Sequence, residues 1–323
     1  MHSISVLAAF LIMAPANPPE PPKVAGPYTH GKLAVYVIRG PQADSRSYIT
    51  LDEGLKSGAV KLREHGGGDV NTLEVENGSD EYLFLHVGDV IRGGKQDRTI
   101  ATDVVLPPRS TPVTIDAFCV EQGRWEADGA SGMAFSLNEA MVSGTALKRT
   151  IQADKSQGEV WNEVAETEAL AAMYLEMSSP RLSDSGTYSA IVDNETLKAK
   201  RADYVETLLP QVMAHDDAIG VVVAIDGELV GADVYGSHEL FQKLVRKLLD
   251  SYAQESILAG ESVSGPALAL DDVKRFLAAG DSVQTELISE TMERRSSDNV
   301  DAEIFEYRVR GDDRPLHSSY VKK

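Results

Sequence analysis

The chain has 323 residues, of which 42% are hydrophobic, enough for a sizeable core in one large domain or two ordinary ones. Its 31 basic and 50 acidic residues give a formal net charge of −19. This charge excludes the basic footprint of a nucleic-acid-binding protein and argues against adhesion to anionic membranes. A small anionic ligand is compatible with it only in a local pocket where Lys and Arg outweigh the overall field.

The first 16 residues have the pattern of a signal peptide. An apolar run from Ile4 to Met13 ends at Ala14-Pro15-Ala16, which has the A-x-A form of a cleavage site. The run is too short to span a bilayer, and no later stretch of the sequence is long and apolar enough to do so. The segment before the run lacks Lys and Arg, so an apolar tail or a mis-assigned start is the alternative. Export predicts a periplasmic or secreted protein.

Residues 17–29 are rich in proline and predict an extended linker that leads into one folded unit, residues 30–323. Residues 30–130 carry mainly strand signals, beginning with the apolar β-rich segment at 31–40. Residues 48–66 predict a short helix and then another strand.

A hairpin signal follows in the same part of the chain. Asn77-Gly78 separates two apolar runs, the pattern of two strands joined by a tight turn.

From residue 131 onward the pattern changes to helical spacing. Ser156 with Glu159 three residues later is a capping-box pattern before a helix. The predicted apolar face of that helix comprises Val160, Trp161, Val164, Ala165 and Leu170. A second helix covers about residues 194–213.

Asp226-Gly227 predicts a hairpin turn, and Ser237 is the expected N-cap of a longer helix. The apolar face of this longer helix comprises Leu240, Leu244, Leu248 and Tyr252. A short helix and a terminal hairpin close the chain.

The fold class expected from this order is α+β. The strands come in hairpins rather than in strict β-α-β alternation, which favours antiparallel pairing. We expect a β-rich N-terminal half, residues 30–130, and a mixed helical and β half, residues 131–323. No linker separates the two halves, so they should pack into one composite domain.

The segment GDVIRGGKQDR, residues 88–98, is the first candidate for chemistry. It is not a phosphate-binding P-loop, because Asp89 stands at the position of the first glycine and Gln96 replaces the Ser or Thr that holds magnesium. It is not a dinucleotide-binding fingerprint either.

Individual residues of this segment nevertheless have properties that suit ligand binding. Gly93-Gly94 lets the backbone approach a ligand or adopt positive φ. Lys95 and Arg98 can meet an anion, the arginine with its planar fork. The alternative is a polar connection between strands with solvated charges.

The second candidate is FCVEQGRW, residues 118–125. Cys119 and Arg124 are separated by four residues, one fewer than in the cysteine-phosphatase loop. Glu121 lies between them and would repel a phosphate and raise the thiol pKa. We therefore expect a buried, unreactive Cys119. Trp125 is either a core residue or a stacking platform.

No metal site or cofactor is predicted. The seven histidines are scattered and show none of the spacings of metal ligands. His86 with Asp89 at a strand end is the nearest approach to a ligand pair, and a structural histidine is the favoured interpretation there.

Three segments taken together resemble a known family. VGDVIRGGKQDRTIATDVVLPP, DAFCVEQGRW and QGEVWNEV occur in this order and resemble the ARPP-1 domain family, the ADP-ribosylglycohydrolase and rhodanese-phosphatase-superfamily-associated proteins of bacteria. The similarity extends over about residues 30–320. The resemblance implies a role near NAD-derived nucleotides. Export would separate the protein from cytoplasmic NAD and would therefore weaken this implication.

The resemblance implies a shared site built from both segments. Asp97 and Glu121 would orient the cations or act as a general base. The residues expected to bind a ligand are Gly93, Gly94, Lys95, Gln96, Arg98, Arg124 and Trp125. The alternative is a structural salt-bridge knot that links the β part to the helical part through Trp125 and Trp161.

Two functions remain open from the sequence. The first is binding or processing of a nucleotide-like, ADP-ribose-related or other anionic small molecule. The second is an exported, non-enzymatic module that contacts another protein and whose polar clusters are structural. Whether the chain is an enzyme stays open, and a thiol enzyme built on Cys119 is disfavoured.

Overall fold

The computed structural model describes residues 22–65, 71–124, 135–260 and 268–323. Helices and strands occur in similar amounts and most strand pairs are antiparallel, which confirms the α+β class. The predicted signal peptide, residues 1–16, lies outside the described residues. In the described part of the chain, no helix has the length and apolar character needed to cross a membrane.

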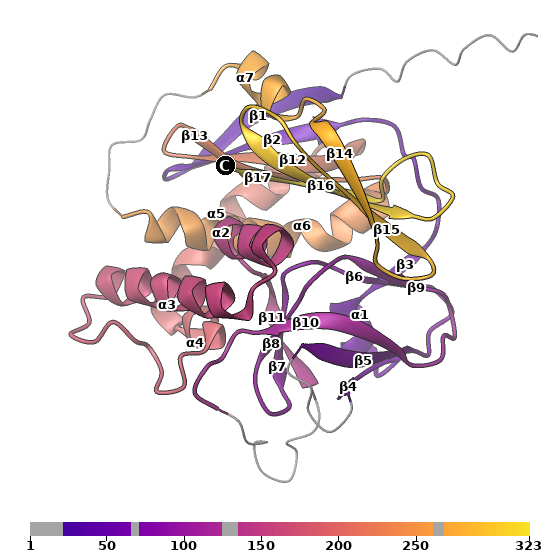
Figure 1. Cartoon of the computed structure of the whole chain (residues 1–323). Coiled ribbons are helices and arrows are strands. Elements are labelled where there is room, and N and C mark those ends of the chain that lie inside the picture. Colours follow the sequence, from indigo (N-terminus) through magenta and orange to yellow (C-terminus); the bar gives the residue numbers. More distant parts are fainter. Residues whose placement is uncertain (1–21, 66–70, 125–134, 261–267) are drawn as a thin grey trace, which may run out of the picture.

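Eight antiparallel strands form the largest sheet, which occupies the upper part of Figure 1. It combines the start of the chain with its C-terminal half, because the second strand pairs with the twelfth. The strand order across this sheet is β1 (Lys23–His30), β2 (Leu33–Arg39), β12 (Ala218–Ile225), β13 (Glu228–Tyr235), β17 (His317–Lys322), β16 (Ala302–Val309), β15 (Met292–Asp298) and β14 (Asp281–Leu287).

Strand β1 differs from the expectation for this segment. Residues 23–29 belong to the predicted linker 17–29, yet they pair antiparallel with β2. Proline is tolerated there because β1 is an edge strand and the register shifts between Ala25 and Tyr28, around Pro27. The predicted β-rich part 30–130 is also divided in space, since β2 belongs to the large sheet and the later strands do not.

Two smaller sheets form the lower right of Figure 1. The order across the six-stranded sheet is β11 (Phe135–Val142), β7 (Asp89–Gly93), β8 (Arg98–Ile100), β10 (Val113–Cys119), β5 (Thr72–Asn77) and β4 (Val60–Glu64). The three-stranded sheet contains β3 (Tyr48–Thr50), β6 (Tyr82–Leu85) and β9 (Val104–Leu106).

The hairpin predicted at Asn77-Gly78 is wrong. Strand β5 pairs with β4 and β10, whereas β6 pairs with β3 and β9, so the two strands enter different sheets. The Asn77 side chain closes the loop between them instead. Its amide donates to the carbonyls of Glu81 and Pro107, and its oxygen accepts from the Ser79 amide. These bonds satisfy a buried polar side chain and fix the crossing between sheets.

The helices cover both faces of the large sheet. Helices α5 and α6 lie against one face, where both contribute buried side chains to the largest hydrophobic core, and α7 covers the other face. The bounds are α1 (Leu51–Ser57), α2 (Thr145–Arg149), the π-helical turn η2 (Thr150–Asp154), α3 (Gln157–Tyr174), α4 (Tyr188–Asp193), α5 (Glu195–Met213), α6 (His238–Leu258) and α7 (Leu270–Phe276).

The predicted helix starts are confirmed. Ser156 accepts a hydrogen bond from the Glu159 amide at the start of α3, and Ser237 accepts one from the Leu240 amide at the start of α6. The predicted face of α6 is buried as expected. On α3 the prediction holds for Val160 and Val164, which are buried. It fails at Ala165, which is exposed, and at Leu170, which is 43% exposed at the edge of a cavity between helices.

Candidate functional site

The two predicted polar segments lie side by side, and we call them the sheet-end cluster: Gly93 to Arg98 together with Glu121 and Arg124. Strands β8 and β10 pair through Arg98 and Cys119, so the turn before β8 faces the residues that follow β10. The Arg124 guanidinium is 3.1 Å from the Asp97 carboxylate and 2.7 Å from that of Glu121. The sequence-based expectation that both segments meet is therefore confirmed.

Asp97 is the centre of this cluster, and its hydrogen-bonding capacity is fully used. One carboxylate oxygen accepts from the Gly93 amide at 3.2 Å and from Arg124. The other accepts from the hydroxyls of Thr187 at 2.8 Å and Ser189 at 2.6 Å. Both hydroxyls lie at the start of α4, so Asp97 ties the β-rich part to the helical part.

The Glu121 carboxylate also has hydrogen-bond partners within the protein. It accepts from the Asp97 amide at 3.0 Å and from Arg124, and only 3% of the residue is exposed. Burial acts to raise the pKa of Glu121, but the hydrogen bonds from Arg124 and the Asp97 amide outweigh burial and lower the pKa overall. A buried carboxylate held ionised by these partners is poorly suited to take up a proton as a general base.

The cations of the cluster also face protein groups. Arg98 is completely buried, donates to the Gln96 carbonyl at 2.8 Å and lies 3.6 Å from the Glu64 carboxylate. The Lys95 amide donates to the same carboxylate. Gly94 has φ +58°, and a Cβ there would lie 2.5 Å from the Phe135 ring, so this position requires glycine. Trp125 lies outside the described residues.

The third segment of the family pattern joins the same region. The Gln157 side chain at the start of α3 accepts from the Cys119 amide at 2.9 Å and donates to its carbonyl at 2.8 Å. Cys119 itself is buried, and burial raises the pKa of its thiol to about 11. The expected burial of Cys119 is confirmed, and the raised pKa of its thiol favours an unreactive cysteine. The geometry of all three segments favours the structural alternative, but the observed links between the β part and the helical part run through Asp97 and Gln157, whereas the predicted link is through Trp125 and Trp161.

A second polar cluster, which the sequence did not reveal, lies in the interior; we call it the buried network. The His317 ring lies between the carboxylates of Asp103, at 2.6 Å, and Asp233, at 3.2 Å. Lys148 is 3.0 Å from Asp233. The His86 ring contacts the Tyr235 hydroxyl at 2.7 Å. These residues come from segments up to 231 positions apart, so no local spacing could have predicted them.

The buried network has the charge balance of an ion-pair cluster. Burial acts to lower the pKa of His317, but Asp103 and Asp233 outweigh burial and raise it to about 9. Burial and the positive His317 hold the pKa of His86 well below its ordinary value. Two carboxylates thus face two cations, Lys148 and His317.

The same network contains a group of potential metal ligands. Atoms of His86, Asp233 and His317 lie within 4.8 Å of one another. Both nitrogens of the His317 ring face carboxylates, and both nitrogens of the His86 ring contact oxygen atoms of the protein. A metal would have to displace these bonds beside the Lys148 ammonium, so the donor set fits an ion-pair network better than a metal centre.

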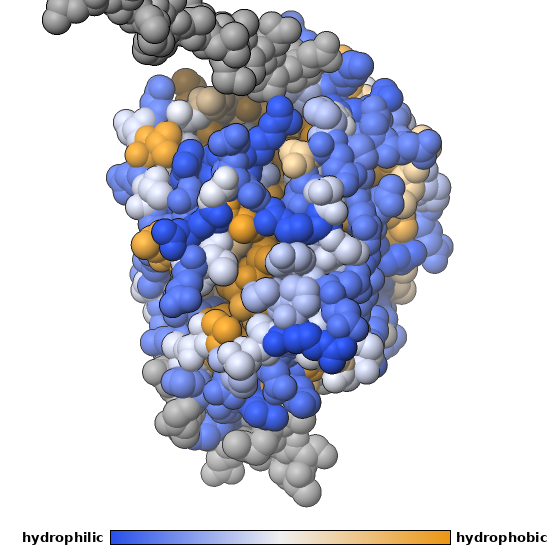
Figure 2. All heavy atoms as spheres, turned by 90° about the vertical axis from the view of Figure 1, so that its right-hand side faces the viewer, coloured by the Kyte–Doolittle hydropathy of each residue, from blue (hydrophilic) through white to orange (hydrophobic). Residues whose placement is uncertain are grey.

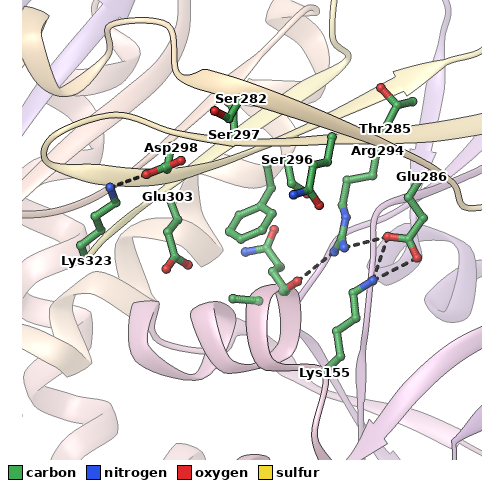
Figure 3. Close-up of a pocket in the computed structure, with 14 residues that line it drawn as sticks. Lys155, Ser282, Thr285, Glu286, Arg294, Ser296, Ser297, Asp298, Glu303 and Lys323 are labelled. Carbon is green, nitrogen blue, oxygen red and sulfur yellow. Dashed lines mark hydrogen bonds and ion pairs between the residues drawn. The ribbon is translucent and has the colours of Figure 1, made fainter.

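A polar concavity lies elsewhere, beneath strands β14, β15 and β16 (Figure 3); we call it the groove. Its volume is about 660 Å³. The lining combines charged, hydroxyl and amide side chains with one phenyl ring: Gln152, Ala153, Lys155, Ser282, Gln284, Thr285, Glu286, Arg294, Ser296, Ser297, Asp298, Glu303, Phe305 and Lys323.

Two cations of the groove converge on one carboxylate. Lys155 and Arg294 each approach Glu286 to 2.8 Å (Figure 3). Their hydrogen bonds and charges, that of Lys155 first, lower the pKa of Glu286. Arg294 is only 4% exposed, donates to the Gln152 carbonyl at 3.1 Å, and has no partner for its Nε among the described residues. The arrangement is one that binds an anion from two sides.

Comparison with known proteins places the chain in a family. The model of the ARPP-1 domain, described as the ARG and Rhodanese-Phosphatase-superfamily-associated Protein domain, matches residues 22–321. The chain therefore belongs to the ARPP-1 family, as the three sequence segments indicated. The comparisons with curated proteins and with solved structures found no match. Family membership associates the chain with ADP-ribosylglycohydrolase and rhodanese-phosphatase systems.

Proposed function

We propose that this protein binds a small anionic molecule of the nucleotide-like class in the groove. The observation that carries the proposal is the convergence of Lys155 and Arg294 on the Glu286 carboxylate. A phosphate or carboxylate of a ligand would take the position of that carboxylate and form the same charge-assisted hydrogen bonds.

The two partners of this ion-pair group differ in how firmly they are held. Arg294 is buried and anchored to the Gln152 carbonyl. Glu286 is 49% exposed and lies on the edge strand β14, along which every residue is exposed. An acid on an exposed edge can move aside at small cost, while the buried arginine stays in place. The groove thus provides a pre-placed cation whose internal counter-ion is exchangeable.

The remaining lining supports a ligand rich in hydroxyl groups. Ser296, Ser297 and Thr285 offer hydroxyls that both donate and accept. Lys323 adds a third cation, at present 2.6 Å from Asp298. These groups suit the ribose and phosphate portions of a nucleotide or of ADP-ribose, in agreement with the systems with which the family is associated.

A second candidate is the exported module that contacts another protein. The observation in its favour is the same edge strand, whose Val283 and Leu287 are 58% and 65% exposed. An unpaired strand edge with apolar side chains can pair with a strand of a partner. On the face drawn in Figure 2, hydrophobic residues form a narrow band between hydrophilic ones, which limits a contact there to a strip.

Isothermal titration of the purified chain with ADP-ribose, NAD, AMP and ribose 5-phosphate tests the first candidate. We expect at least one saturable interaction, weakened about tenfold or more in Lys155→Ala, because a hydrogen bond to a charged group contributes about 1.5–3 kcal/mol. Glu286→Gln should bind more tightly, since the competing carboxylate has lost its charge.

Lys274→Ala on α7 is the matched control, because this lysine is exposed and pairs only locally with Asp271. Its affinity should equal that of the unsubstituted chain. Equal affinities in Lys155→Ala and the control, or no binding of any compound, would refute the groove as the site and leave the partner-protein candidate.

A further inference from the structure

A second concavity lies among helices α2, α3, α4 and α6, away from the groove; we call it the helical cavity. Its volume is about 390 Å³. Most of its wall is apolar and includes Ala146, Leu147, Leu170, Met173 and Leu258. A concave, mostly apolar space of this size with a few polar groups is the usual form of a small-molecule site.

Two carboxylates enter this cavity from opposite helices. Glu163 comes from α3 and Glu255 from α6. Glu255 is oriented by Thr145, whose amide donates to one carboxylate oxygen at 3.2 Å and whose hydroxyl donates to the other. Within the described parts of the chain, the Glu163 carboxylate has one weak contact, from the Thr167 hydroxyl at 3.5 Å. The second carboxylate is therefore available to a ligand.

The cavity lining carries negative charge and no Lys or Arg among the described residues. Two cations, Lys148 and Arg201, act on lining residues from behind the wall and are committed elsewhere, and a third, Lys32, donates to the backbone carbonyl of the lining residue Gly260. Lys148 is 3.0 Å from Asp233, and Arg201 is 2.9 Å from Asp250. Neither Lys148 nor Arg201 can neutralise the pair Glu163 and Glu255 by direct contact without breaking its own ion pair.

We propose that the helical cavity binds an organic amine, a small molecule that combines a protonated ammonium group with an apolar body. The ammonium would lie between Glu163 and Glu255 and donate to both. The apolar body would fill the space between Leu147, Leu170 and Leu258.

The electrostatics of the unliganded cavity support this assignment. Burial raises the pKa of Glu255, and burial together with Glu166 and Glu255 raises the pKa of Glu163. Each carboxylate is thus held in surroundings that disfavour its charge. A bound cation would relieve this cost, whereas a bound anion would increase it. The cavity therefore selects the opposite charge from the groove.

The edge of the cavity also fits an apolar ligand. Leu170 and Met173 are 43% and 66% exposed although they belong to a helix whose neighbouring face is buried. A bound ligand with an apolar body would cover these two side chains and remove their apolar surface from water. The flexible thioether of Met173 can adapt to ligands of different shape.

Titration calorimetry with three indole compounds of matched shape tests the proposal: tryptamine, tryptophol and indole-3-propionate, which carry an ammonium, a hydroxyl and a carboxylate. We expect tryptamine to bind about tenfold or more tightly than tryptophol, and indole-3-propionate to bind weakest. The double variant Glu163→Gln, Glu255→Gln should abolish the preference for tryptamine and leave the affinity for tryptophol unchanged.

Glu159→Gln is the matched control, an identical change on the same helix at an exposed position outside the cavity. It should retain the full preference for tryptamine. If the double variant does not fold, the single variant Glu163→Gln replaces it and should lower the preference about threefold or more. Equal affinities for the three compounds, absence of saturable tryptamine binding, or a preference that survives the Gln substitutions would overturn the proposal.

Discussion

The sheet-end cluster and the groove are built from the same kinds of side chain and differ in solvent access. In the sheet-end cluster Asp97 is 3% exposed, and its oxygens accept four hydrogen bonds from the protein. In the groove Glu286 is 49% exposed and its two cations face an open concavity. The first arrangement holds two parts of the chain together, and the second leaves its charges available to a ligand. Residue type alone does not separate these roles.

The comparison also bears on the role of the residues in the family pattern. The three segments that resemble the family pattern converge on Asp97, Cys119 and Gln157, which join the small sheets to the helices. The groove lies outside these segments, and in the lining of the helical cavity Glu163 alone belongs to one of them, QGEVWNEV. A shared sequence pattern can therefore mark the joint of a fold while binding takes place on surfaces next to it.

Removal of the central carboxylate of the sheet-end cluster should have the largest effect. Asp97→Ala removes one of the two carboxylates that Arg124 contacts and the shared acceptor of two hydroxyls, so we expect a loss of about 3–5 kcal/mol in the free energy of unfolding. Glu286→Ala in the groove should cost only about 1 kcal/mol, because Glu286 and Lys155 are about half exposed and the buried Arg294 keeps its hydrogen bond to the Gln152 carbonyl. Urea unfolding of both variants measures the two losses. Equal losses would contradict the distinction between a structural sheet-end cluster and an accessible groove.

The pH dependence of stability should reveal the buried network. The pKa of His317 is raised to about 9 from an ordinary value of 6.5. The contribution of protonated His317 to the free energy of unfolding is therefore fully present below about pH 6.5 and is lost as the pH rises through about 9. The total contribution is on the order of 3 kcal/mol. Urea midpoints across this range measure it. The decline should be absent in His317→Asn, and an equal decline in that variant would contradict the assignment.

Substitution of the lone cysteine should have a smaller effect. Cys119→Ala removes a buried sulfur and leaves the backbone bonds to Gln157 intact, so we expect a loss of about 1 kcal/mol. Binding of any groove ligand should not change. In the unsubstituted chain, iodoacetamide should label Cys119 only after unfolding, and rapid labelling of the folded protein at neutral pH would contradict its burial.

Neutralisation of one acid in the helical cavity should have the smallest effect, with the opposite sign. Because the pKa of Glu163 is raised in the folded protein, its ionisation lowers stability as the pH rises through that pKa. Glu163→Gln should therefore increase the melting temperature slightly at neutral pH and leave it unchanged in acid. A decrease at neutral pH would mean that Glu163 has a stabilising partner.

Part of the candidate site could be predicted from the sequence. The segments at 93–98 and 121–124 were expected to meet, and they do. Their expected ligand-binding role stays a prediction that the observed burial disfavours, since sequence shows which charges are near one another and not how much water reaches them. The groove was missed because Lys155, Glu286 and Arg294 carry no motif and come together only when β14 and β15 fold over η2.

The sequence by itself determined the local features of this protein. Ser156 and Ser237 begin helices, Asp226-Gly227 forms a turn with φ of 55° and 79°, and Cys119 is buried. Capping, turn geometry and apolar periodicity act between residues a few positions apart, so a linear pattern records them.

Only the tertiary structure decided which distant segments meet. It paired β2 with β12, sent β5 and β6 into different sheets, and placed His317 between Asp103 and Asp233. These contacts join positions as far apart as 214 residues, and their strength comes from shared burial rather than from spacing along the chain. Burial also decided which charged clusters are closed and which remain open to a ligand.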